Sequence, residues 1–182
     1  MNENTIKGAL MLLKKMIHPQ LESLEGKGFE RLAGRAIILR GQEILLLYTK
    51  RYDDYSFPGG GIDPHEDIET GLARELAEEI GAVSYKVLSY LGEIEEYRPY
   101  YKEEYDFMHM ISHYYVCQLT GPLVDVQLED YEIKNGMERR WISLQDAIDH
   151  NEALMASQSE AIGLSIERET YVLKLIQDQM EA

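Results

Sequence analysis

The feature that most constrains the fold is one amphipathic helix predicted between two stretches of β-rich sequence. Ile68, Leu72 and Leu76 recur every four residues, which places them on one face of a helix over residues 67–80. Gly81 is expected to end this helix, because glycine readily adopts the left-handed conformation found just past a helix end. A helix with one apolar face must pack against another layer, so the pattern predicts an α+β domain.

Strands are predicted on both sides of this helix. Residues 31–40 and 43–51 are joined by a tight turn at Gly41, as in a β-hairpin. Residues 83–97 and 106–119 are rich in β-branched and aromatic side chains. The last of these segments is apolar on both faces, which is typical of a central strand covered on two sides.

The carboxyl-terminal third is predicted to contain a short strand and two helices. The strand covers residues 137–142, and Ser143 can cap a helix that runs through His150. Apolar positions at helical spacing predict a final helix over residues 158–180. The expected architecture is a mixed sheet between helices, an α/β/α sandwich.

The amino-terminal segment also shows helical spacing. Its apolar positions, which predict an amphipathic helix over residues 5–24 with an interruption at Pro19, are Ile6, Leu10, Leu13, Ile17, Leu21 and Leu24. Residues 25–28 resemble a linker, so we expect a helical extension over residues 1–28 and a domain over residues 29–182. The terminal helices either pair two copies into a homodimer or pack on the domain.

Charge and cysteine content narrow the possible partners and the compartment. The net charge of −15 disfavours a nucleic-acid polymer but permits a small phosphorylated substrate beside a bound cation. The single cysteine, Cys117, excludes an intrachain disulfide and lies in an apolar run, so we expect a buried thiol and a reducing cytoplasm. No apolar run reaches the length of a membrane span.

Three carboxylates near the end of the central helix break local rules. Glu75, Glu78 and Glu79 fall within an arc of roughly 100° on the helical wheel, where like charges repel. They also lie at the negative end of the helix dipole, and Glu79 falls at the edge of the apolar stripe. A solvated face with Arg74 paired to Glu78 explains only part of this. A divalent cation explains all of it, and the neighbouring Gly60 lets a backbone carbonyl approach the ion.

These residues form a longer pattern that resembles the Nudix box. The pattern consists of Gly60, five residues, Glu66, seven residues, Arg74-Glu75-Leu76, one residue, Glu78-Glu79, one residue, Gly81 and Ala82. Every fixed position of the Nudix signature is filled. Only Ala82 departs from it, because a larger aliphatic residue is usual there. The segments 56–60 and 140–144 also resemble the family, and the resemblance extends over about residues 30–150.

The resemblance implies a Nudix fold with extra amino-terminal and carboxyl-terminal helices. It also implies hydrolysis of a nucleoside diphosphate linked to another moiety, with Mg²⁺ or Mn²⁺ as cofactor. Glu75, Glu78 and Glu79 would hold the metal with the Gly60 carbonyl and act in catalysis. Arg74 would act with them, paired with Glu66 so that the carboxylates are oriented.

Two residues are candidates for the cap of the central helix. The resemblance favours Asp67 as the cap of the central helix. Spacing alone suggests Asp63, which is followed by Pro64 and, three residues on, by Glu66.

The sequence offers several candidates for the general base and for the residues that contact the substrate. The base is one of the three helix glutamates or a residue of a later loop, where the candidates are Glu129, Asp130 and Glu132. Tyr97 and Tyr100, in the aromatic segment 93–106, are predicted to contact a nucleotide substrate.

Several substrates fit these features. ADP-ribose or a nucleotide sugar is one option, and a (d)NTP or a diadenosine polyphosphate is another. A different class of protein, a regulatory Nudix module that binds a nucleotide without cleaving it, is also considered. The three ligating glutamates argue for the hydrolase.

Overall fold

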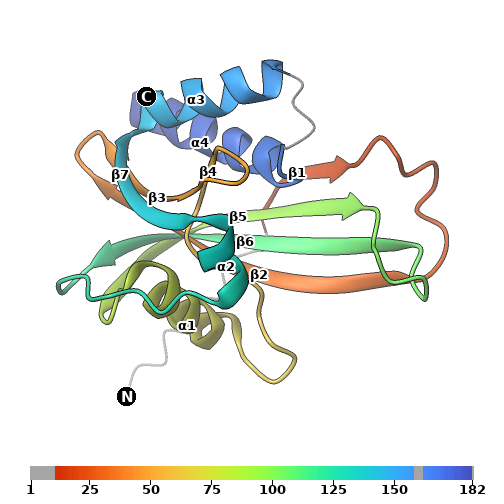
Figure 1. Ribbon diagram of the computed structural model, residues 1–182, viewed down its shortest axis with the longest axis horizontal. Coiled ribbons are helices and arrows are strands. Elements are labelled where there is room, and N and C mark those ends of the chain that lie inside the picture. Colours follow the sequence, from red (N-terminus) through yellow and green to blue (C-terminus); the bar gives the residue numbers. More distant parts are fainter. Residues whose placement is uncertain (1–10, 158–161, 182) are drawn as a thin grey trace.

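A computed structural model describes residues 11–157 and 162–181. In this part of the chain a mixed sheet of seven strands lies between helices, so the expected α+β sandwich is confirmed (Figure 1). The strands are β1 (Leu12–Ile17), β2 (Gly28–Arg40), β3 (Glu43–Thr49), β4 (Asp54–Ser56), β5 (Tyr85–Arg98), β6 (Phe107–Leu119) and β7 (Met137–Ser143). The helices are α1 (Ile68–Ile80), α2 (Asp130–Asn135), α3 (Leu144–Ala156) and α4 (Ile166–Glu181).

The sheet order explains how two cores arise. The strands follow the order β1-β5-β6-β2-β3-β4, and β7 also pairs with β3. Because side chains alternate along a strand, Ile37 faces the core beneath α3 and α4, whereas Ile38 faces the core beneath α1. Figure 1 shows α1 on one side of the sheet and α3 and α4 on the other. The prediction of a central strand at β6 is confirmed, since β6 pairs with both β5 and β2.

The central helix forms as predicted. Its cap is Asp67, as the resemblance favoured and spacing alone did not, because the Asp67 carboxylate accepts a hydrogen bond from the Thr70 N–H at 2.7 Å. Gly81 ends the helix in the left-handed conformation at φ 67°. Ser143 likewise caps α3 by accepting a hydrogen bond from the Asp146 N–H at 3.0 Å.

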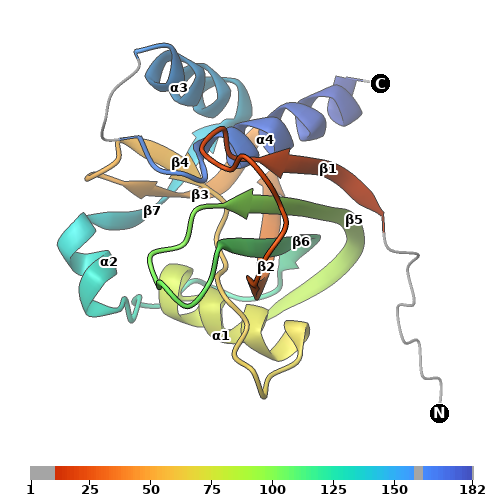
Figure 2. The same cartoon turned by 90° about the vertical axis from the view of Figure 1, so that its right-hand side faces the viewer.

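The prediction of an amino-terminal helix is wrong over the described residues. Leu12–Ile17 form β1, which pairs in parallel with β5 at the edge of the sheet, next to α4 (Figure 2). Tyr171 of α4 donates a hydrogen bond to the Leu13 carbonyl at 3.3 Å. Leu13 and Met16 both pack on the core under α4, although three-residue spacing is helical and would place them on opposite faces of a regular strand. The pairing of β1 with β5 shifts register between Leu12 and Lys14, which brings both side chains to the same face. Backbone pairing with β5 decides for the strand.

The remaining expectations for the termini have mixed outcomes. Residues 1–10, which hold part of the predicted helix, lie outside the described residues, and so do residues 158–161. The final helix begins at Ile166, later than expected. The domain boundary between residues 28 and 29 and the homodimer stay predictions.

Cys117 is buried, as expected. Among the described residues no helix is both long and apolar enough to cross a membrane.

Candidate active site

A cavity of about 750 Å³ opens beside the carboxyl-terminal half of α1. Its walls come from α1, the glycine segment 59–61, β2, the end of β5, β4, and the start of α4. Glu75, Glu78 and Glu79 all line it, together with Arg74. The tertiary structure therefore brings the predicted carboxylates to a space large enough for a small molecule.

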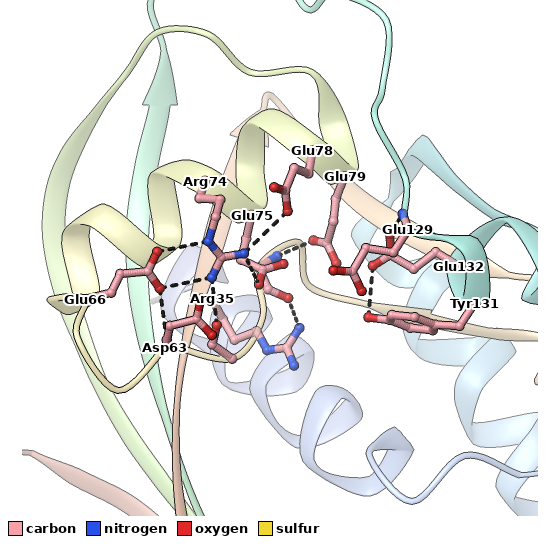
Figure 3. A network of polar contacts seen from close by, with 12 residues as sticks. Arg35, Asp63, Glu66, Arg74, Glu75, Glu78, Glu79, Glu129, Tyr131 and Glu132 are labelled. Atoms are coloured by element: carbon pink, nitrogen blue, oxygen red, sulfur yellow. Dashed lines mark hydrogen bonds and ion pairs between the residues drawn. The ribbon is translucent and has the colours of Figure 1, made fainter.

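Arg74 connects Glu75 and Glu78 of this helix with Glu66 (Figure 3). Its Nη1 donates to Glu75 at 2.9 Å and to Glu78 at 3.4 Å. Its Nε and Nη2 donate to the two oxygens of Glu66 at 2.9 and 3.0 Å, which is a bidentate ion pair. These hydrogen bonds, with a further one from the Asp63 N–H, lower the pKa of Glu66 to about 2. The predicted ion pair between Glu66 and Arg74 is confirmed.

Glu79 is buried, as its place at the edge of the apolar stripe predicted. Only 5% of the residue is exposed, and its Oε2 accepts a hydrogen bond from the Gly59 N–H at 2.6 Å. Burial raises the pKa of Glu79 well above its usual value, although the nearby Arg35 charge opposes the shift. Burial also raises the pKa of Glu75, against the opposing effect of Arg74.

The glycine segment is in close contact with charged side chains. A Cβ at Gly60 would lie 2.5 Å from the Glu75 carboxylate, and one at Gly61 would lie 2.4 Å from the Arg31 guanidinium. The Gly60 carbonyl accepts a hydrogen bond from the Gly34 N–H at 3.0 Å, which uses one of its two lone pairs. Glycine at these positions therefore lets the Glu75 and Arg31 side-chain ends approach the backbone without being displaced.

Of the loop carboxylates considered as bases, the structure brings one to the cavity. Glu129 lines the cavity, whereas Asp130 is exposed and does not line it. Glu132 is buried and accepts hydrogen bonds from the Glu129 N–H at 2.7 Å and from the Tyr131 hydroxyl at 3.2 Å. In Figure 3 Glu129 and Glu132 lie on the far side of Glu79 from Glu75.

The two tyrosines predicted to contact substrate do not line the cavity. Tyr97 stacks on His109 with ring centroids 4.3 Å apart, and Tyr100 stacks on Phe29 at 4.9 Å. Successive side chains on β5 point to opposite faces of the sheet, so Arg98, next to Tyr97, lines the cavity instead. The aromatic segment is therefore adjacent to the site, but its arginine rather than its tyrosines faces it.

The donor set fits a hard divalent cation. Glu75, Glu78 and Glu79 supply carboxylate oxygens, which Mg²⁺ prefers as ligands, and the open cavity leaves room for water. In residues 11–157 and 162–181 no three His, Cys, Asp or Glu side chains are already gathered as a metal site. Glu75 and Glu78 instead accept hydrogen bonds from Arg74, and Glu79 accepts one from the backbone.

Sequence reasoning missed several charged residues of the cavity. Arg35, Asp54, Arg98 and Arg168 line it from four different elements. Arg35 donates to the Phe57 carbonyl at 3.2 Å and also to the Gly59 carbonyl. Arg35 is the one charged residue in the otherwise apolar segment 32–39, and this could have indicated a functional side chain from the sequence. The other three had no comparable local signal.

Asp54 makes a pH-dependent contribution to stability that can be measured. It is 4% exposed, and burial followed by the charge of Glu169 raises its pKa from 3.8 to about 6. A raised carboxyl pKa means that stability is lost as pH rises from about 4 through about 6. We expect Asp54→Asn to be more stable than the wild type by about 1–3 kcal/mol near pH 8, with the gain shrinking toward about pH 5.

Urea unfolding at several pH values measures this difference. The control is Asp130→Asn, which changes an exposed aspartate outside the cavity and is expected to shift stability by less than about 0.5 kcal/mol. An Asp54→Asn gain that is the same at every pH would contradict the prediction.

A sheet between helices thus places a carboxylate-bearing helix beside a glycine segment and a cavity. Comparison with known proteins gives the family. Residues 30–162 match the model of the NUDIX domain. This chain belongs to the Nudix family, and it is a hydrolase that acts on pyrophosphate bonds.

Two curated relatives illustrate the similarity. The chain is 33% identical to diphosphoinositol polyphosphate phosphohydrolase 3-alpha of Mus musculus over 134 aligned residues. The aligned region covers 71% of this chain and 73% of the relative. The chain is 34% identical to diphosphoinositol polyphosphate phosphohydrolase 2 of Rattus norvegicus over 71% of this chain and 66% of the relative.

Solved structures agree on the fold. The NUDIX hydrolase from Nitrosomonas europaea superposes with a TM-score of 0.52 at 17% identity, over 79% of this chain and 90% of its own. The MutT protein from Methanosarcina mazei Go1 superposes with a TM-score of 0.51 at 20% identity, over 85% of this chain and 99% of its own. The matched NUDIX domain ends before α4, so Arg168 lies outside it.

Proposed function

We propose that this protein hydrolyses a pyrophosphate bond of a small phosphorylated molecule with Mg²⁺ or Mn²⁺ as cofactor. The observation that supports this most is the excess of negative charge at one end of α1. Glu75 and Glu78 share the guanidinium of Arg74, which is already paired with Glu66, and Glu79 forms no ion pair within the described residues. A divalent cation bound there would neutralise phosphate charge and lower the pKa of a water molecule. The donor atoms proposed for it are the three carboxylates and the Gly60 carbonyl.

The surrounding residues keep these groups in place. Arg74, held by Glu66, orients the Glu75 carboxylate, and the Gly59 N–H holds Glu79. One carboxylate of the cavity accepts the proton of the attacking water. The candidates are the three helix glutamates and, from the loop, Glu129, because neither Asp130 nor Glu132 lines the cavity and Glu132 already accepts two hydrogen bonds.

Two substrate classes are supported by different observations. The family resemblance favours a nucleoside diphosphate linked to another moiety, such as ADP-ribose or a nucleotide sugar. The second class carries several phosphates, as in a diadenosine polyphosphate or in the diphosphoinositol polyphosphates that name the relatives. It is favoured by the arginines that line the cavity.

A substrate panel tests the proposed function. ADP-ribose, a nucleoside triphosphate, diadenosine tetraphosphate and a diphosphoinositol polyphosphate are incubated with the protein in Mg²⁺, in Mn²⁺ and in a chelator. We expect turnover of at least one substrate with a metal and none with the chelator, and Glu78→Gln is expected to remove it. Binding without turnover across the whole panel would contradict the proposal and indicate a nucleotide-binding module.

A further inference from the structure

Arginines line one wall of the cavity in a chain whose net charge is −15. Arg31 and Arg35 lie on the face of β2 that also carries Ile37, on the side of the sheet covered by α4. Arg98 comes from the end of β5 and Arg168 from α4. None of the described lining residues is a lysine. Guanidinium groups bind phosphate in a bidentate geometry that an ammonium group does not offer.

Sheet register brings these arginines together. Arg31 pairs with Met110 of β6, and Met110 pairs with Glu96 of β5, so the three residues form one row across the sheet. Arg168 lies next to this row, because its Nη1 donates to Glu96 and lies 3.4 Å from the Met110 sulfur. Arg98 is two residues beyond Glu96 on the same face of β5.

The arginines differ in whether a carboxylate already neutralises them. Arg168 is paired with Glu96 and Glu169, all three of them buried. In the described part of the chain, neither Arg31 nor Arg98 forms an ion pair or donates a side-chain hydrogen bond. These two guanidinium groups are therefore free to bind an anion.

Two further observations indicate that an anion belongs here. The Nε of Arg35 is buried and has no hydrogen-bond partner within the residues described. Burial lowers the pKa of Arg98, and the charges of Arg168, Arg31 and Arg35 lower it further, against the opposing effect of Glu96. Like charges placed together out of water are unfavourable, and a bound anion removes this cost.

The position of Arg31 relates this wall to the carboxylates. Its guanidinium lies against Gly61, and the Glu75 carboxylate lies against the adjacent Gly60. An anion that binds Arg31 would therefore lie close to the Glu75 carboxylate, on the side of the cavity formed by β2 and β5.

We propose that Arg31 and Arg98 form an anion subsite that binds a phosphate group of the substrate other than those of the bond that is cleaved. This inference rests on the proposed function and deepens it, because the preferred substrate then carries phosphate beyond one pyrophosphate. The further phosphates belong either to a longer phosphate chain or to a phosphorylated ring.

The first test measures binding without turnover. The probe is myo-inositol hexakisphosphate, which has phosphates but no pyrophosphate bond, titrated calorimetrically without metal into the wild type, Arg31→Gln and the double variant Arg31→Gln/Arg98→Gln. We expect the affinity to fall about tenfold for each arginine removed. Arg40→Gln is the matched control, since Arg40 is also on β2 but outside the cavity, and it should bind as the wild type does. Arg31 is exposed, so its variant keeps the test valid if the double variant does not fold.

The second test measures kcat/KM with Mg²⁺. We expect the double variant to lose at least tenfold more kcat/KM on the multiply phosphorylated substrate than on ADP-ribose. Diadenosine tetraphosphate and a diphosphoinositol polyphosphate distinguish chain-borne from ring-borne phosphate. Equal losses on every substrate, or unchanged affinity of Arg31→Gln for the probe, would overturn the subsite.

The two proposals fail in different ways. If probe binding depends on Arg31 and Arg98 but no substrate is hydrolysed, the two arginines still form an anion site, whereas the proposed function and the role of this site in cleavage fall. If ADP-ribose is hydrolysed and the wild type does not bind the probe, the proposed function stands and the subsite falls.

Discussion

Replacing Glu79 with glutamine is expected to lower kcat by about two to four orders of magnitude and to raise the melting temperature. Glutamine keeps an acceptor for the Gly59 N–H, which lies 2.6 Å from Glu79, so the glycine segment should stay in place. It removes a charge that the proposed cation needs. It also removes a buried charge whose pKa is raised well above the usual value by burial.

The sign of the stability change follows from that pKa. A carboxyl group with a raised folded-state pKa stabilises the fold at low pH, and this contribution is lost as pH rises through the raised value. The gain of Glu79→Gln should therefore be largest at neutral and alkaline pH. Thermal unfolding at several pH values measures the stability change, and product formation with Mg²⁺ from whichever substrate of the panel is hydrolysed measures kcat.

A control on the same helix separates the site from general effects. Glu69, in the first turn of α1, is exposed and does not line the cavity. Glu69→Gln is expected to leave kcat unchanged and to cost only a few tenths of a kcal/mol through the helix dipole. Near-normal turnover in Glu79→Gln would contradict the assignment of Glu79.

Replacing Arg168 with methionine is expected to cost about 3–5 kcal/mol of folding stability. Arg168 is 1% exposed and pairs with Glu96 and Glu169, which are also buried. Methionine fills much of the same volume but leaves two carboxylates without their cation. Glu169 also accepts a hydrogen bond from the Phe57 N–H at 3.1 Å, so α4 holds the chain just before the glycine segment.

An exposed ion pair on the same helix provides the control. Lys174 of α4 pairs with Glu152, and the two side chains are 49% and 43% exposed. Lys174→Met is expected to change the free energy of unfolding by less than about 1 kcal/mol, measured by urea denaturation. Equal losses in Arg168→Met and Lys174→Met would show that burial of the Arg168 cluster does not matter.

The segment Leu12–Ile17 shows where periodicity alone is ambiguous. Leu13 and Met16 are spaced as in a helix, yet the segment pairs with β5, where its backbone groups find partners. By contrast, α1 was predictable because two local signals agree. These signals are an apolar stripe and a terminator at Gly81, whereas the cap at Asp67 was favoured by the family resemblance and not by spacing.

The sequence by itself determined α1, most of the strands, and the carboxylates of Glu75, Glu78 and Glu79, because helical spacing and capping act over a few residues. Only the tertiary structure decided which residues face those carboxylates. Arg31 and Arg98 lie 67 positions apart in the chain and meet because β6 pairs with both β2 and β5. The register of β5 turns Arg98 toward the cavity and Tyr97 away from it, and a shift of one residue would exchange the two.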